Sequence, residues 1–393
     1  MTALHDARGL FADLTDREPD GVWSAPGRVN LIGEHTDYNE GFVLPFAIPH
    51  RTFAAAAARD DDRIRVASTF AEQPVEVSLR DLETLFPTAS GSAPAVPEWS
   101  AYPLGVAWAL RALRADRTMF GVDIAIASDV PVGAGLSSSA AIEGAVAAAL
   151  AELWALGIDP VTLAQAGRRA ENEAVGAPTG IMDQMASTLG RADAATFLDC
   201  RTLETRSIPT GFEAAGLELL VIDTRVKHAH STGGYRERRE ACERGAGLLG
   251  IRSLRDATTA DLPRAAALMD DTTFRRVRHV ITENQRVLDT VAVLEAEGPH
   301  GIGQLLVASH ASMRDDFEIS VAELDAAVDA ALAAGAIGAR MTGGGFGGAA
   351  IALVERTQVA AVADAVERVF VDAGFTAPHI FTVTPSEGPR RDV

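Results

Sequence analysis

The order of strand-like and helical segments predicts an α+β protein with two domains. The length of 393 residues suits two domains better than one. Strands and helices do not alternate strictly, as they would in a doubly wound parallel sheet, and helices dominate from about 233 to 335. We therefore expect an N-terminal domain over 1–210, a C-terminal domain over 211–393, and room for a cleft between them.

The N-terminal domain is expected to open on an amphipathic helix and to continue into short strands. A Pro-, Ser- and Gly-rich stretch over 86–98 predicts a loop. FVLPFAI and RTFAAAA are interpreted as two separate strands, because each is a short run of strand-forming residues. The expected helices are 1–15, 99–113, one opened by Ser137 to Ser139, 160 to about 174, and one from about Ile181; the expected strands are 42–48, 51–57, 64–68, 75–79 and 123–128.

The C-terminal domain is expected to begin with the strand LELLVID, 217–223, near the domain boundary. Helices follow, and MTGGGFGGAAIALV, 341–354, then predicts a glycine-rich loop and a strand. A helix over 358–372 and a last strand near 380 complete the expected order.

Charge and composition exclude several classes of protein. The net charge of −19 and the absence of a Lys/Arg run argue against nucleic acid and anionic membranes as partners. The N-terminus lacks an apolar signal-peptide core, and the longest apolar stretch, 144–158, is too short to span a bilayer. Cys200 and Cys242 have neither disulfide nor metal-ligand spacing. We expect a cytoplasmic protein that is monomeric or forms a weak homodimer.

A glycine- and serine-rich segment, PVGAGLSSSAAIEGA over 131–145, is the first candidate ligand site. Its glycines let the backbone turn tightly and approach a ligand, and serines that open a helix leave N–H groups to attract phosphate. The segment is not a Walker A loop, because Gly-Lys-Ser/Thr is missing. A glycine turn before a serine-capped helix would explain it equally well.

Two carboxylates flank a Gly/Pro loop in RRAENEAVGAPTGIMDQMAS, 168–187. Glu171 is expected near the end of one helix and Asp183 near the start of the next, so both could face one cleft. A carboxylate at a helix N-terminus keeps its charge, which suits a base or a metal ligand. The plain alternative is a helix-capping Asp183 and a solvated Glu171.

Two further segments carry unusual patterns. The five glycines around Phe346 in MTGGGFGG are more than one turn needs, which indicates close approach to a ligand or to another loop, or a structural turn. APGRVNLIGEHTDYNEG, 25–41, crowds polar groups such as Glu34, His35 and Asp37, which suit the fixed hydrogen bonds of a sugar. Its E-H-x-D spacing lacks the helical zinc arrangement HExxH.

Together these segments resemble the galactokinases, within the GHMP small-molecule kinases. GRVNLIGEHTDY over 27–38 is similar to the galactokinase signature, PVGAGLSSSAA to the ATP-binding loop, GIMDQ to the segment with the catalytic aspartate, and TGGGFGG to the third motif. The resemblance covers about 20–385. It implies an active site in the cleft between two α+β domains, where the γ-phosphoryl of ATP passes to the 1-hydroxyl of α-D-galactose.

The resemblance also implies a role for each matching position. Asp183 would be the catalytic base, with Arg28 beside it stabilising its anion and the transferring phosphoryl group, and Ser139 and Glu171 would hold Mg²⁺. The implied sugar positions are Glu34, His35, Asp37, Gly180 and Tyr235; the implied nucleotide positions are Ser68, Gly133, Ala134, Gly135, Leu136, Ser137, Ser138 and Ser139.

Two positions depart from the family pattern, and two other functions remain open. Thr179 stands where many galactokinases have Cys, and Arg225 where relatives often have Asn. Neither is expected to touch the chemistry, although both could tune sugar choice. The alternatives are a kinase for N-acetylgalactosamine, arabinose or galacturonate, and a non-catalytic sugar and ATP sensor. The intact residues Asp183, Arg28, Ser139 and Glu171 and the lack of a basic DNA-binding segment speak against the sensor.

Overall fold

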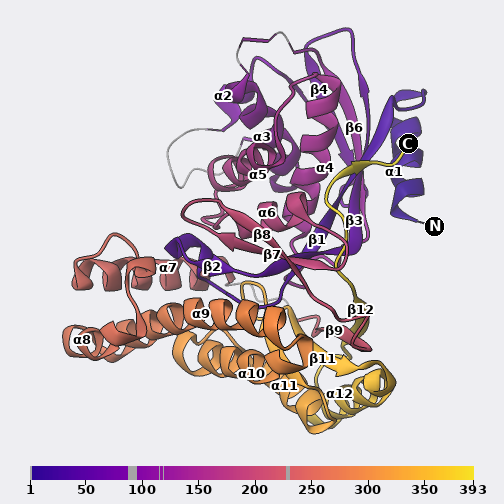
Figure 1. Ribbon diagram of the computed structural model, residues 1–393. Coiled ribbons are helices and arrows are strands. Elements are labelled where there is room, and N and C mark those ends of the chain that lie inside the picture. The colour runs from indigo at the N-terminus through magenta and orange to yellow at the C-terminus, as the bar shows by residue number, and fades with distance from the viewer. Residues whose placement is uncertain (1, 87–94, 115, 118, 227–230) are drawn as a thin grey trace.

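Two lobes, one above the other, make up the protein (Figure 1). The computed structural model describes residues 2–86, 95–114, 116–117, 119–226 and 231–393. Strands and helices are mixed in both lobes, which confirms the α+β class. Most of the loop expected over 86–98 lies outside the described residues.

A six-stranded sheet forms the centre of the N-terminal lobe. Its order is β13-β1-β3-β6-β4-β5, and every neighbouring pair is antiparallel except β4 with β6. The strands are β1 (Gly21–Asn30), β3 (Pro45–Ala58), β4 (Arg63–Ser68), β5 (Val75–Ser78), β6 (Val122–Ser128) and β13 (Arg390–Arg391).

Helices cover both faces of this sheet. Phe11 and two alanines of α1 pack on one face, and α3 and α4 bury their apolar sides on the other around Trp23 and Trp108. The helices of this lobe are α1 (Ala3–Thr15), α2 (Leu82–Leu85), α3 (Glu98–Leu113), α4 (Ser138–Leu153), α5 (Pro160–Arg169) and α6 (Met182–Leu189), with a 3-10 turn at Asp37–Asn39 and a π-helix at Ala170–Val175.

Two smaller sheets complete the fold. A three-stranded sheet of order β2-β7-β8 comprises β2 (Phe42–Val43), β7 (Ala194–Asp199) and β8 (Thr205–Pro209). The C-terminal lobe has an antiparallel sheet of order β10-β11-β9-β12, with β9 (Leu217–Asp223), β10 (Gly338–Thr342), β11 (Ala349–Glu355) and β12 (His379–Val383).

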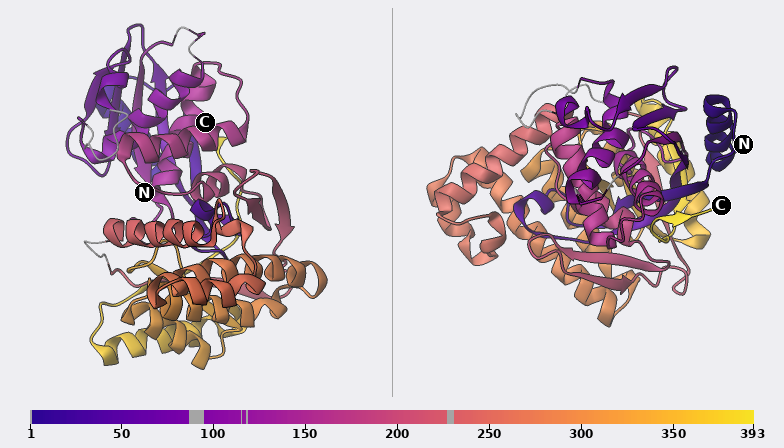
Figure 2. Two further views of the ribbon diagram at one scale, coloured as in Figure 1. Left: turned by 90° about the vertical axis from the view of Figure 1, so that its left-hand side faces the viewer. Right: turned by 90° about the horizontal axis from the view of Figure 1, so that it is seen from above.

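Helices make up most of the C-terminal lobe, as Figure 2 shows from the side. They are α7 (Ser231–Leu249), α8 (Leu262–Leu268), α9 (Asp271–Ala296), α10 (Gly303–Ser312), α11 (Ala322–Ala333) and α12 (Val359–Ala373), with a π-helix at Met313–Phe317 and 3-10 turns at Leu254–Asp256, Thr259–Asp261, Pro299–Ile302 and Arg356–Gln358. None of the helices in the described ranges is long and apolar enough to cross a membrane.

Several local expectations were wrong. FVLPFAI and RTFAAAA are not two strands: the short β2 is followed by one long strand, β3, in which Pro45 sits at the first position, where its missing N–H does no harm. The helix expected to reach 174 ends at Arg169 and continues as a π-helix. Strands β1, β7, β8, β10 and β13 were not predicted.

The end of the chain returns to the N-terminal lobe. β13 pairs with β1, so that Arg391 lies opposite Trp23 and Arg390 opposite Ser24. In Figure 1 this segment is the yellow strand that climbs from the lower lobe to the upper one. The residues of β13 therefore belong to the sheet of the N-terminal lobe, and the boundary near 210 stays a prediction.

Candidate active site

A cavity of about 300 Å³ lies between the lobes and collects most of the predicted functional residues. The predicted residues that line it are Arg28, Glu34, His35, Asp37, Gly133, Gly135, Leu136, Ser137, Ser138, Ser139, Gly180, Asp183 and Tyr235. Three others do not line it. Ala134 is buried in the apolar core, Glu171 is buried beside Ser139, and Ser68 ends β4, where its hydroxyl accepts a hydrogen bond from the Phe70 N–H.

Asp183, in the first turn of α6, is oriented by two neighbours. Arg28 Nε and Nη2 approach Asp183 Oδ1 at 2.9 and 2.7 Å, and the Ser137 hydroxyl donates to Oδ2. Arg28 is itself fixed, because its side chain is only 5% exposed and Nη1 donates to the Gly135 carbonyl. The Asp183 side chain keeps 24% exposure toward the cavity. A carboxylate held in this way can accept a proton from a bound ligand.

A bulge in β1 sets the position of Arg28. The register of β1 against β3 shifts between Pro26 and Arg28. Gly27 lies at this shift, and a Cβ there would come within 2.6 Å of the Leu136 carbonyl oxygen. Only glycine lets β1 pass so close to the glycine- and serine-rich loop.

Two glycine-rich loops meet at the cavity backbone to backbone. Gly135 and Gly343 both have positive φ, 70° and 85°, and a Cβ on Gly343 would lie 2.8 Å from the Gly135 carbonyl oxygen. Close approach to another loop, one of the three explanations open from the sequence, therefore accounts for part of the glycine excess. Helix α4 begins at Ser138, after Ser137 in a left-handed conformation (φ 57°). The N–H groups of its first turn have no partner within the helix.

Glu171 lies on the π-helix and is held by the loop before α6. The Thr179 hydroxyl and the Gln184 side-chain N–H both donate to Glu171 Oε2, at 2.8 and 2.7 Å. Burial raises the pKa of Glu171, and the negative charge of Asp183 adds to the rise, whereas hydrogen bonds, including one from Ser139, oppose it. Thr179, which was not expected to touch the chemistry, lines the cavity, and its hydroxyl contacts the proposed metal ligand Glu171.

Excess negative charge at this end of the cavity suits a magnesium ion. Burial raises the pKa values of Glu143 and Glu171, and the negative charge of Asp183 adds to both rises, whereas Arg28 is the cation that pairs with Asp183. In the described ranges, no three His, Cys, Asp or Glu side chains converge on one metal position. Ser139 and Glu171 instead offer two oxygen ligands, which fits Mg²⁺ held mainly by phosphates and water.

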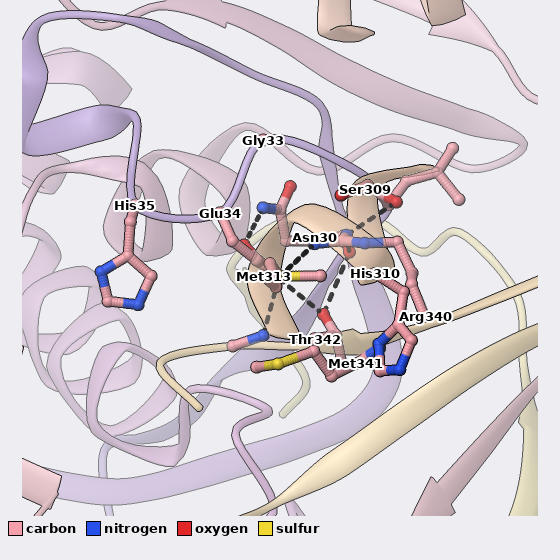
Figure 3. A network of polar contacts seen from close by, with 12 residues as sticks. Asn30, Gly33, Glu34, His35, Ser309, His310, Met313, Arg340, Met341 and Thr342 are labelled. Carbon is pink, nitrogen blue, oxygen red and sulfur yellow. Dashed lines mark hydrogen bonds and ion pairs between the residues drawn. The ribbon is translucent and has the colours of Figure 1, made fainter. Parts of the chain in front are cut away.

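At the opposite end, the Glu34 carboxylate is enclosed by protein donors (Figure 3). Oε1 accepts the Gly343 N–H at 2.7 Å and the Thr342 hydroxyl at 3.2 Å, and it lies 3.4 Å from Arg340 Nη2. Oε2 accepts the Asn30 side-chain amide. Burial raises the pKa of Glu34 above its usual value, and the charge of Arg340 only partly offsets this rise. Glu34 therefore joins the segment 25–41, which is proposed to bind the sugar, to β10 of the other lobe.

His35 uses both of its ring nitrogens within the protein. Nε2 lies 3.2 Å from the Gly344 carbonyl and Nδ1 lies 2.8 Å from the Tyr38 hydroxyl. Since a carbonyl can only accept, Nε2 carries the proton and the Tyr38 hydroxyl donates to Nδ1. Burial lowers the pKa of His35 to about 3, so the ring is neutral at pH 7. The Tyr235 ring lies 4.8 Å from it, centre to centre.

Asp37 approaches the loop before α6 more closely than any side chain there would allow. A Cβ on Gly180 would lie 1.8 Å from Asp37 Oδ2. Burial and the nearby charge of Asp183 raise the pKa of Asp37 to about 6, against backbone hydrogen bonds from Tyr38 and Met182. Glycine at 180 is therefore required for Asp37 to lie beside Asp183 in the cavity.

Comparison with known proteins agrees with this geometry. The galactokinase galactose-binding signature matches residues 9–58, the GHMP kinase N-terminal domain 101–191, and the GHMP kinase C-terminal domain 291–372. A galactokinase from Streptomyces coelicolor is 54% identical over 97% of this chain and 96% of its own. The chain belongs to the galactokinase family. A galactokinase from Mycobacterium tuberculosis H37Rv is 44% identical over 91% of this chain and 95% of its own.

Solved structures show the same fold. The galactokinase of Lactococcus lactis complexed with galactose superposes with a TM-score of 0.91 at 31% identity, over 99% of this chain and 100% of that one. A mevalonate kinase superposes with a TM-score of 0.62 at 18% identity, over 93% and 99%, which concerns the fold alone. The family, the fold class and the class of ATP-dependent sugar kinase expected from the sequence are confirmed.

Three residues of α9 hold the segment 33–42 of this galactokinase fold, and the sequence analysis assigned them no role. Glu283 Oε1 accepts the Gly33 N–H at 3.0 Å, Asn284 Oδ1 accepts the Phe42 N–H at 2.9 Å, and His279 Nε2 lies 3.1 Å from the Glu34 carbonyl. All three side chains are buried. His279 and Glu283, four residues apart, share one helical face, whereas Asn284 follows directly after Glu283, so the sequence signals only the first two.

Proposed function

We propose that this chain transfers the γ-phosphoryl group of ATP to the 1-hydroxyl of α-D-galactose, giving α-D-galactose 1-phosphate and ADP. The observation that carries the proposal is the position of Asp183, held by Arg28 between the glycine- and serine-rich loop and the sugar segment. A hydroxyl bound on one side of Asp183 would therefore face a phosphoryl group bound on the other.

In the proposed reaction, Asp183 receives or orients the proton of the 1-hydroxyl as its oxygen attacks the γ-phosphorus. The bond from that phosphorus to the bridging oxygen of ADP breaks, and the leaving oxygen keeps the electron pair. The Arg28 guanidinium stabilises the Asp183 anion and charge on the transferring group. Such transfers depend mainly on positioning and charge stabilisation.

The loop 133–139 and the start of α4 would bind the phosphates through backbone N–H groups and serine hydroxyls. Ser139 and Glu171 would hold Mg²⁺, with Thr179 orienting the Glu171 carboxylate. The chemistry that bound Mg²⁺ supplies is neutralisation of charge on the phosphate oxygens. Ser68 remains a proposed nucleotide contact.

Asp37 and Tyr235 are the proposed readers of the sugar hydroxyls, with the Gly180 backbone beside them. Glu34 would offer its remaining lone pairs to a sugar hydroxyl, since protein donors already occupy much of its carboxylate. His35 would contribute the surface of a fixed, neutral ring, because both of its nitrogens are engaged.

A coupled ADP-release assay with a sugar panel tests the proposal. We expect turnover with galactose and little with glucose, N-acetylgalactosamine, arabinose or galacturonate. A higher kcat/KM for one of the other sugars would make the chain a kinase for that sugar. Binding of galactose and ATP without turnover would favour the sensor. A monomeric or weakly homodimeric state and a cytoplasmic location are parts of the same proposal.

A further inference from the structure

A single side-chain amide joins the three segments that carry the proposed phosphoryl-transfer residues. Gln184 follows Asp183 on α6 and is 2% exposed. Its Nε2 donates to Glu143 Oε2 at 2.9 Å and to Glu171 Oε2 at 2.7 Å. An amide nitrogen has only two hydrogens, so both are used and the orientation of the Gln184 amide is fixed.

The bridge connects separate elements. Glu143 lies on α4, one turn after Ser139 and therefore on the same side of the helix. Glu171 lies on the π-helix, and Gln184 is next to the proposed base on α6. The positions of Ser139, Glu171 and Asp183 relative to one another thus depend on one buried bridge.

Glycine in α5 makes room for this bridge. A Cβ on Gly167 would lie 3.1 Å from Gln184 Cγ and 3.3 Å from Glu143 Oε2, tighter than ordinary contact. Gly167 lies inside a helix, where glycine is unfavourable by about 1 kcal/mol relative to alanine. Its presence is explained by the close packing of α5 on the Glu143–Gln184 pair.

Glu143 is buried without a cation of the described ranges beside it. Its side chain is 1% exposed, and no Lys or Arg of the described residues forms an ion pair with it or with Glu171. Burial and then the charge of Glu171 raise its pKa well above the usual value. Glu143 Oε1 and Gln184 Oε1 also have no hydrogen-bond partner in the described part of the chain.

We propose that Gln184 and Glu143 are positioning residues of this enzyme: the Gln184 amide, anchored by Glu143, engages Oε2 of Glu171 together with Thr179 and so leaves Oε1 for Ser139 and a metal. The inference rests on the proposed metal role of Glu171. Neither residue touches the cavity, so both act through Glu171. Loss of such an outer contact typically weakens metal affinity about 10–100-fold.

Gln184→Met, similar in shape but without the two donors, tests the bridge. Mn²⁺ binding is measured by electron paramagnetic resonance with the enzyme, ADP and no sugar, and kinetics are measured separately. We expect Mn²⁺ affinity to fall about 10–100-fold, the Mg²⁺ requirement of kcat to rise, and KM for galactose to stay within about twofold. Unchanged Mn²⁺ affinity overturns the proposal, whatever happens to stability.

Glu143 supplies a second, independent test. Glu143→Gln keeps an acceptor oxygen for the Gln184 amide and should retain Mn²⁺ affinity within about threefold of wild type, whereas Glu143→Leu should lower it about as much as Gln184→Met. If Gln184→Met does not fold, this pair decides alone. Equal Mn²⁺ affinities of the two Glu143 variants, or loss in both, overturn the proposal.

Ser187→Ala is the matched control, because it removes a buried hydrogen bond from the same helix, to the Pro26 carbonyl, without touching the bridge. It should lower the melting temperature and leave Mn²⁺ affinity unchanged. Failure here is distinguishable from failure of the proposed function: absence of galactose turnover in wild type refutes the sugar and reaction, but not the Mn²⁺ shift measured without sugar.

Discussion

Two pairs of glutamates, one at each end of the cavity, are buried in opposite ways. At the sugar end, Glu34 lies beside Arg340, and Glu283 lies beside Arg286, so that each acid has a cation of the protein next to it. At the phosphate end, Glu143 and Glu171 share the Gln184 amide, and no described Lys or Arg pairs with either.

The difference follows from what each end has to do. A loop that reads sugar hydroxyls must be fixed before the sugar arrives, and permanent ion pairs with extra hydrogen bonds fix it. The proposed site for ATP and Mg²⁺ receives its negative charge from the nucleotide and its positive charge from the metal. Acids without a protein cation lower the stability of the empty protein, and a bound magnesium ion would compensate their negative charge.

The largest effect is expected where the two ends meet, at Asp183. Asp183→Asn is nearly isosteric, so ATP and galactose should still bind. General-base assistance is worth about 10²–10⁴ in rate, and kcat should fall by that factor. Single-turnover kinetics on the purified variant, with ligand affinities measured by calorimetry, provide the check. A kcat like that of wild type would remove Asp183 from the mechanism.

Arg340→Met and Glu171→Gln should affect stability in opposite directions. Arg340→Met leaves Glu34 buried without its cation, and loss of one partner of a buried pair costs about 3–5 kcal/mol. Glu171→Gln removes a buried charge that has no cation, so the ligand-free protein should be as stable as wild type or more so, yet nearly inactive. Urea unfolding without ligands measures both. A destabilised Glu171→Gln would break the comparison.

Asp37→Ala sharpens the sugar end. We expect kcat/KM for galactose to fall about 10²-fold or more, since a buried acceptor that reads a hydroxyl is lost. The loss for 4-deoxygalactose should be much smaller, because part of the interaction is already absent. The measurement is kcat/KM for both sugars with both enzymes. Equal proportional losses would exclude Asp37 as the reader of the 4-hydroxyl.

The smallest effect is a difference in pH dependence. Burial raises the pKa of Glu283, but the charge of Arg286 opposes this, and the pKa is lowered from 4.5 to about 2. The contribution of Glu283 to stability is therefore present above about pH 4.5 and is lost as the pH falls toward 2. The raised pKa of Glu143 has the opposite effect on stability, which declines as the pH rises above about 4.5.

Unfolding free energies of wild type, Glu283→Gln and Glu143→Gln between about pH 2.5 and pH 8 measure these slopes. Relative to wild type, Glu143→Gln should gain stability as the pH rises, with a slope of at most about 1.4 kcal/mol per pH unit. The stability deficit of Glu283→Gln relative to wild type should shrink as the pH falls below about 4.5. Parallel slopes for the two variants would show that the two ends treat their acids alike.

The sequence by itself determined the parts of the site that are local. Ser137 to Ser139 before a helix, Asp183 at the start of another, and the glycines of both loops are readable because turn and helix-end chemistry depends on neighbouring residues. The order of the motifs also carried the family, and with it the α+β fold. Glu171 was assigned a helix end correctly, although its helix closes in a π-helix, because helix termini respond to tertiary packing.

Only the tertiary structure decided how these parts are held. The sequence assigned Glu34 to the sugar positions but gave no sign that Arg340, some 300 residues away, lies beside it. Glu283 and Glu143 were ordinary helix residues in the sequence. Their roles follow from which helix packs on which loop, and burial is what makes their partners matter: an exposed carboxylate is satisfied by water, whereas a buried one depends on the few donors within reach. Local chemistry is written in neighbouring residues, but the environment of a buried charge comes into existence only when distant segments pack together.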